Sequence, residues 1–316
     1  KLTFEYHHLQ EFRRGGNMLN RPPHEADIAE QIQHSINGGG LKFDYFAPNE
    51  KHRLTLYTSA QHTDRDSYYG SKKDLNAYGK TTDLTFIGGS QYVYSFDKCL
   101  FMPADLTAGL EYNRDNLKDD MWGYNRYTRQ TVNIGSAFFQ NEWKNEKWSI
   151  LLGGRLDKHN LINHVIFSPR ANLRFNPTQD VNLRLSYSSG FRAPQAFDED
   201  LHIENVGGTV SMIERAKNLK EEKSQSFSAS ADMYHRFGAF QVNFLVEGFY
   251  TKLSDVFVLE NIGERDGILI KERRNGSGAK VLGLSMEGKM AYLSLFQLQA
   301  GVTLQQSRYD EPEKWS

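Results

Sequence analysis

Three consecutive acidic residues, Asp198, Glu199 and Asp200, form the densest group of carboxylates in the polar connections of this sequence. Hard cations such as calcium bind to several carboxylate oxygens. Asp119 and Asp120 form a second acidic pair. No segment has the spacing of a calcium-binding loop. We therefore favour simple solvated charge, keep calcium in the loops as the alternative, and expect no other cofactor.

Aromatic side chains form a second candidate group, because rigid ring faces suit the recognition of flat or ring-bearing ligands. Packing between loops, or a place at a lipid interface, would use the same residues, and we slightly favour this alternative. The candidates lie in long polar connections, which we expect to be extracellular loops: Tyr68, Tyr69, Trp122, Tyr124, Tyr127 and Phe197.

A third group alternates with apolar residues, so that its side chains share one face of a strand. It consists of Arg170, Asn172, Arg174, Asn182 and Arg184. Arginine on such a face donates several hydrogen bonds to carboxylates. The sequence contains neither a Gly-x-Ser-x-Gly elbow nor a zinc-protease helix motif, and no catalytic residue is indicated. We expect a protein that is not an enzyme.

Composition restricts the class of protein. The 316 residues carry a net charge of -1, so no overall field favours nucleic acid, and no nucleic-acid partner is expected. The single cysteine excludes an internal disulfide. Mean hydropathy is only -0.63. No apolar run is long enough for a membrane helix, so the chain either is soluble or spans a membrane as strands, which need only every second residue apolar.

The elements that must position these residues are strands. Apolar and polar side chains alternate in Val181–Ser189, where Leu183 and Leu185 flank Arg184. The same period predicts about thirteen strands, near residues 2–10, 31–46, 53–63, 84–96, 104–113, 130–141, 148–157, 167–175, 181–189, 224–236, 239–254, 281–292 and 295–306.

The connections between these strands alternate in length. Long links are predicted near residues 13–28, 66–83, 114–129, 158–165, 190–223 and 255–280, and short links lie between them. Short turns at one end and long loops at the other are typical of antiparallel transmembrane β-barrels of the outer membrane. A closed barrel leaves no edge inside lipid. From the odd strand count we expect residues 1–316 to be a single-domain fragment of a larger barrel, with terminal strands missing.

Several motifs resemble those of TonB-dependent outer-membrane receptors. Gly190-Phe191-Arg192-Ala193-Pro194 is similar to the family segment that opens a long extracellular loop, and the segment 218–224 to the one that returns to the barrel. The segments 249–256 and 275–287 are similar to two further strands of the family.

The resemblance implies a 22-stranded barrel with a plugged lumen, in the bacterial outer membrane, of which this chain forms about 13 strands and lacks the plug domain. It implies active uptake of a scarce, bulky nutrient: siderophore-bound iron, haem, cobalamin or a glycan. Partners would be outer-membrane lipid, the protein's own plug, the TonB system, the nutrient and a surface lipoprotein. The arginine and asparagine face would meet the plug, with contact to the ligand as the less favoured alternative. The alternative is a surface binding protein or adhesin without transport.

Overall fold

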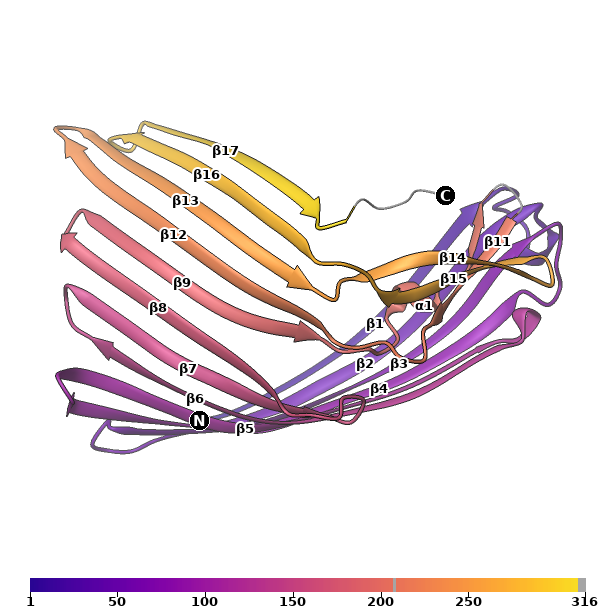
Figure 1. Cartoon of the computed structure of the whole chain (residues 1–316), viewed down its shortest axis with the longest axis horizontal. Helices are drawn as coiled ribbons and strands as arrows, with labels where there is room; N and C mark the ends of the chain where they lie inside the picture. The colour runs from indigo at the N-terminus through magenta and orange to yellow at the C-terminus, as the bar shows by residue number, and fades with distance from the viewer. Residues whose placement is uncertain (207–208, 312–316) are drawn as a thin grey trace.

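A large antiparallel sheet dominates the computed structural model, which describes residues 1–206 and 209–311. Thirteen strands follow one another with nearest-neighbour pairing and curve into an open, trough-like wall (Figure 1). The prediction of an antiparallel barrel sheet of about thirteen strands is therefore confirmed. Among the described residues, no helix is long and apolar enough to cross a membrane.

The strands of this sheet are β1 (Leu2–Gly16), β2 (Ile28–Phe46), β3 (His52–Ser71), β4 (Tyr78–Cys99), β5 (Met102–Met121), β6 (Arg126–Lys144), β7 (Trp148–His159), β8 (Ile166–Thr178), β9 (Val181–Arg192), β12 (Glu222–Phe237), β13 (Phe240–Ser254), β16 (Ala279–Tyr292) and β17 (Phe296–Tyr309).

The register keeps the two faces of the sheet chemically distinct. On β12, Phe227, Ala229, Ala231 and Met233 share one face, and the serines between them share the other. Directly paired residues of neighbouring strands lie on the same face, so the pattern continues across the sheet. We call the face that carries Phe227 the outer face and the opposite one, which holds the loops described below, the inner face.

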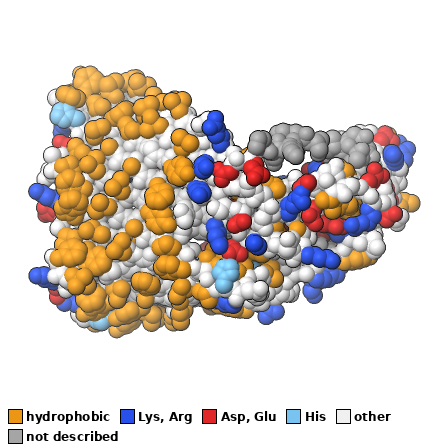
Figure 2. Space-filling model, in the orientation of Figure 1, with side chains coloured by type: hydrophobic (Ala, Val, Ile, Leu, Met, Phe, Trp, Pro, Cys, Tyr) orange, Lys and Arg blue, Asp and Glu red, His pale blue; other side chains and the backbone are white. Residues whose placement is uncertain are grey.

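Apolar side chains on the outer face form a continuous band toward the short-turn end. On β5 the band consists of Leu106, Ala108, Leu110 and Tyr112, and the next outward residue is Arg114. Figure 2 shows hydrophobic side chains over the half of the wall near the short turns and charged side chains over the other half. A band of this kind, bounded by aromatic residues, matches the lipid-facing surface of a membrane barrel. We call it the apolar belt.

Several strands are longer than predicted. β3 continues to Ser71, β4 starts at Tyr78, β5 ends at Met121 and β6 starts at Arg126. Two of the predicted long links, 66–83 and 114–129, are therefore wrong as loops and consist largely of strand. Backbone pairing continues above the belt, where neither face has to be apolar. Because the apolar–polar alternation ends at the belt, it predicts strands that are too short.

Two long connections contain structure of their own. Residues after β9 form helix α1 (Asp198–Leu201), β10 (Glu204–Val206) and β11 (Thr209–Arg215), and residues after β13 form the hairpin β14 (Phe257–Arg265) and β15 (Ile268–Asn275). They combine in a second sheet of order β10-β11-β15-β14, in which β11 and β15 run parallel. Short 3-10 turns occur at Pro23–Glu25 and Trp122–Tyr124.

Candidate functional site

The segment between β9 and β12 lies against the inner face at the long-loop end of the sheet. Gln130 on β6 ties this segment down, because its side-chain oxygen accepts hydrogen bonds from the Ala196 backbone at 2.8 Å and from Arg215 at 2.6 Å. The second sheet and α1 lie beside the ends of the barrel strands (Figure 1). We call this region, formed by residues 193–206, 209–221 and 255–278 and the facing strand ends, the mouth.

Arg273 on β15 fastens helix α1 to the second sheet. Its guanidinium donates to Asp200 at 2.8 Å and to Glu199 at 3.0 Å. Arg273 and Asp200 are both buried, so this pair is shielded from water. Asp200 also accepts a hydrogen bond from the Phe197 backbone at 2.9 Å, which fixes the start of the helix.

A second ion-pair network fastens α1 to the barrel wall. Asp119 on β5 is fully buried and accepts from Thr81 at 2.7 Å and from Arg126 at 3.0 Å. Arg126 also donates to the Leu201 carbonyl at 2.6 Å. Arg65 on β3 donates to Asp198 at 2.8 Å. In this network the buried charges of Asp119 and Arg65 therefore each have an opposite partner.

Arg192, the arginine of the Gly-Phe-Arg-Ala-Pro motif, lies over an aromatic ring. Its guanidinium carbon is 3.7 Å from the centre of the Phe197 ring and 5.6 Å from that of Phe257. A cation over a ring face is held by the ring quadrupole. The motif thus joins the end of β9, the start of α1 and the start of β14.

Asn275 connects the two long segments at their base. Its side chain accepts from the Lys220 backbone at 2.8 Å and donates to the Asp255 carbonyl at 2.8 Å. Asn275 therefore links the segment that leads into β12 to the segment that leaves β13.

The structure brings two of the predicted aromatic residues together. Tyr69 is buried in a cluster with Met121, Ile203, Met212 and Ile270. Tyr124 packs against this cluster and donates a hydrogen bond to the Tyr69 carbonyl. Ring packing of this kind stabilises the mouth, and Tyr69 has almost no surface left for a ligand.

The remaining aromatic candidates lie apart. Tyr68 points to the outer face, where Ala26, Ala29 and Ala77 bury it. Trp122 and Tyr127 are more than half exposed, and Tyr127 lies on β6 on the outer face. Tyr68, Tyr69 and Tyr127 belong to strands, so their predicted location in loops is corrected. Phe197 is the candidate nearest to the Gly-Phe-Arg-Ala-Pro motif, and a ligand role for the whole set stays a prediction.

The five alternating polar residues share the inner face. Arg170 pairs with Ser188, and Arg174 pairs with Arg184, while Leu173 pairs with Leu185 on the outer face. Asn172 and Asn182 follow the same alternation. Asn182 accepts from Arg184 at 2.7 Å. Contact of these side chains with a plug stays a prediction.

A cavity of about 210 Å³ lies beneath α1, lined by Asp83, Asp115, Asp198 and Leu201 among others. Asp115 lies three residues beyond Tyr112, above the apolar belt. Burial, and then the neighbouring Asp83 carboxylate, raise the pKa of Asp115 to about 7. Thr85 reaches both carboxylates, at 3.2 Å and 3.5 Å. Among the described residues, Oδ1 of Asp83 has no hydrogen-bond partner.

The acidic triplet proposed for calcium is held by arginines. Arg65 contacts Asp198, and Arg273 contacts both Glu199 and Asp200. Arg192 lies 3.9 Å from Glu199. In residues 1–206 and 209–311, no group of three or more His, Cys, Asp or Glu side chains is arranged to hold a metal ion. Calcium stays a prediction, and an ion there would have to displace the guanidinium groups.

The sequence did not predict that Arg65, Arg126 and Arg273 belong to the mouth. Arg65 is 133 residues from Asp198, and Arg126 is 75 residues from Leu201. No local period links such residues, because strand pairing across the whole sheet brings them together. The only local signal is the conspicuous carboxylate triplet, which requires counter-charges from somewhere in the fold.

Comparison with known proteins gives one family over nearly the whole chain. The family model described as "TonB dependent receptor-like, beta-barrel" matches residues 7–315. No curated protein sequence matches the chain.

Solved structures of similar fold include two receptors and an outer membrane transporter. The siderophore receptor PirA from Acinetobacter baumannii has 15% identity and a TM-score of 0.66, with 87% of this chain and 44% of that chain covered. The outer membrane transporter YddB from Escherichia coli has 12% identity and a TM-score of 0.70, with 97% and 46% covered.

The hemophore receptor HasR from Serratia marcescens, solved with its hemophore HasA and heme, has 14% identity and a TM-score of 0.69, with 96% and 51% covered. The chain thus spans about half the length of these proteins. At such identities the likeness concerns the fold.

Proposed function

Because the chain belongs to the TonB-dependent receptor β-barrel family, we propose that it forms wall and mouth of a bacterial outer-membrane receptor that takes up a scarce, bulky nutrient. The observation that carries the proposal is the division of one sheet into an apolar outer face, a polar inner face and a folded mouth. The belt suits residence in lipid, and the inner face suits a hydrated plug.

The mouth supplies the ligand contacts in this proposal. Phe197 offers a rigid ring and Arg192 a cation at the exit of β9, and Trp122 remains exposed at the tip of the β5–β6 connection. Such groups recognise a ring-bearing or anionic nutrient. No bond of the nutrient is made or broken. Energy reaches the site through the plug and the TonB system of the full-length protein.

Iron complexes are the first substrate class to test. Proteins of similar structure include siderophore receptors, a hemophore receptor solved with its hemophore and heme, and an iron transporter. Haem, cobalamin and glycans stay in the test as alternatives.

Growth of a deletion strain on defined sources tests the proposal. The strain, complemented with the full-length gene, is grown with a ferric siderophore, haem, cobalamin or a glycan as the limiting source. We expect complementation to restore growth on one source, and Arg192→Gln with Phe197→Ala to reduce uptake on that source at equal surface expression. Equal growth of the deletion and complemented strains on all four sources would overturn transport and favour a surface binding protein.

A further inference from the structure

Three basic side chains lie side by side on the outer face, directly above the apolar belt. Lys252 on β13 pairs with Lys280 on β16, and Lys280 pairs with Arg308 on β17. Their outward neighbours two residues nearer the belt are Tyr250, Leu282 and Gln306. Figure 2 shows Lys and Arg side chains at the border between the hydrophobic and the charged halves of the wall.

Like charges directly opposite each other destabilise a sheet unless an anion compensates for them. Asp310 contacts Lys280 at 2.6 Å and supplies one negative charge. Within residues 1–206 and 209–311, Lys252 and Arg308 form no side-chain hydrogen bond or ion pair. Among the described side chains, three positive charges therefore face one carboxylate, at the height where the lipid surface would lie.

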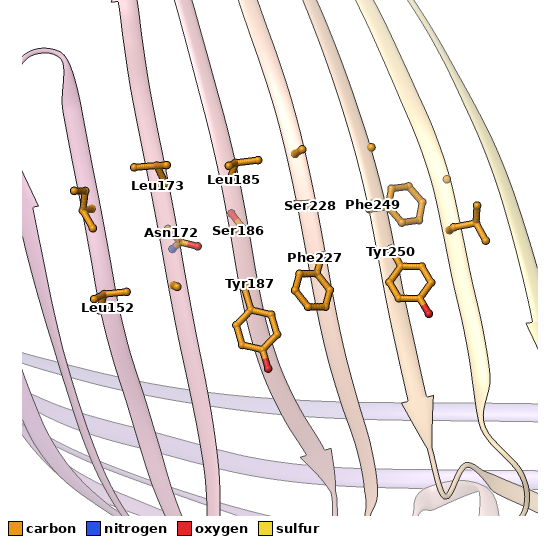
Figure 3. A pocket seen from close by; sticks show the side chains of 16 residues that line it. Leu152, Asn172, Leu173, Leu185, Ser186, Tyr187, Phe227, Ser228, Phe249 and Tyr250 are labelled. Carbon is orange, nitrogen blue, oxygen red and sulfur yellow. The ribbon is translucent and has the colours of Figure 1, made fainter.

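An apolar groove lies beneath this basic row. Its volume is about 790 Å³. Figure 3 shows the rings of Tyr187, Phe227 and Tyr250 in a row on three neighbouring strands. The next outward row is Leu185, Ala229, Gly248 and Leu284, in which the two small residues form a depression between two leucines.

Gly248 keeps the groove open. A Cβ atom added at Gly248 would meet only the Gly283 carbonyl oxygen, at 4.0 Å, so this position faces free space. The row of rings is two residues from the basic row, which is about 7 Å along a strand. A single lipid molecule spans that separation between its phosphate and the start of its acyl chains.

The opposite end of the same strands lacks such a row. The outward residues there include Phe237, Phe240, Tyr292 and Phe296, which are aromatic. A girdle of rings is common to both edges of a membrane barrel. The basic row belongs only to the long-loop end, so it singles out the lipid leaflet on that side.

We propose that the outer face of β9, β12, β13, β16 and β17 binds a phosphorylated lipid of the leaflet at the long-loop end. The phosphate lies on Lys252, Lys280 and Arg308, and an acyl chain fills the groove over Ala229 and Gly248. Phosphate oxygens accept charge-assisted hydrogen bonds from lysine and arginine, and basic pockets at this depth bind lipid head groups. The site is separate from the mouth and independent of the transported nutrient.

Native mass spectrometry of the full-length protein in detergent tests the site. The probes are lipid A, which carries two phosphates on an acylated disaccharide, phosphatidylcholine, and inorganic phosphate. We expect wild type to retain lipid A but not phosphatidylcholine, and Lys252→Gln/Lys280→Gln/Arg308→Gln to lower the retained fraction about tenfold. The matched control Lys98→Gln/Lys147→Gln/Arg236→Gln removes the same charge at the short-turn end and should retain lipid A.

Gly248→Leu tests the groove without touching a charge. We expect it to fold as wild type and to lower the retained fraction of lipid A several-fold, by at most about tenfold. In lipid-free detergent the basic-row variant should unfold no lower than wild type, because it removes like-charge repulsion. Equal retention of lipid A by both variants and wild type would overturn the proposal. If wild type retained inorganic phosphate as well as it retains lipid A, the basic row would be an adventitious anion site only, and the lipid proposal would be wrong.

Discussion

The two halves of β5 illustrate two different ways of stabilising one sheet. From Ala104 to Tyr112 the outward side chains are apolar, and the strand needs only its two neighbours and lipid on the outer face. From Arg114 to Met121 the outward side chains are polar, and Asp119 is fully buried among Thr81, Arg126 and Arg65. The belt depends on a repeated pattern, whereas the mouth depends on individual ion pairs.

This difference implies different sensitivities to mutation. In the belt many apolar residues are interchangeable, because burial in lipid is proportional to area and requires no specific partner. In the mouth a single arginine, Arg273, neutralises the buried carboxylate of Asp200 on α1, which forms no other ion pair with a described residue. Three substitutions test the contrast, beginning with the one of largest expected effect.

Arg273→Ala should be the most damaging change. It leaves Asp200 buried without a counter-charge, and breaking such a pair costs about 3–5 kcal/mol. Thermal unfolding of the full-length protein in detergent and limited proteolysis of residues 193–221 should both report the loss. Arg265→Ala is the control, because its pair with Glu214 is exposed and contributes at most about 1 kcal/mol. If the two variants were equally stable, the mouth would not depend on this ion pair.

Ala231→Arg should destabilise the belt by a smaller amount. Ala231 points outward between Leu183 and Val246, and arginine on the lipid face costs about 2–4 kcal/mol near the middle of the bilayer. Ser230→Arg is the matched control, because the adjacent side chain points inward, between Glu247 on β13 and Arg184 on β9. Unfolding in lipid bilayers measures both. Equal destabilisation by the two arginines would contradict the assignment of the faces.

Asp115 should give the smallest effect, a dependence of stability on pH. Its pKa of about 7 in the folded protein exceeds the ordinary value of 3.8, so the folded state holds a proton that the unfolded state releases. This contribution is complete below about pH 4 and is lost as the pH rises to about 7. Unfolding between pH 4 and 8 should therefore show a shallower decline for Asp115→Asn than for wild type. The exposed control Glu146→Gln should show the wild-type dependence of stability on pH. If Asp115→Asn also showed the wild-type dependence, the Asp83–Asp115 pair would not be the cause of the decline.

Part of the candidate site could be predicted from the sequence. The position of Arg192 at the exit of β9 follows from the motif, and the inner-face location of Arg170 and Arg184 follows from alternation, as the register shows. The locations of Tyr68 and Tyr69 in loops were wrong, because strand pairing above the belt leaves no hydrophobic period to detect. These two neighbours point to opposite faces and are buried in different clusters.

By itself, the sequence determined about how many barrel strands this chain forms, their order, and which residues face outward in strands of clear alternation such as β9. These properties are local, since side chains alternate along every strand and lipid demands an apolar outer face. Only the tertiary structure decided that Arg65, Arg126 and Arg273 surround α1, and that Lys252, Lys280 and Arg308 form one row above a groove. Both arrangements depend on register between strands far apart in the chain, which no local pattern encodes.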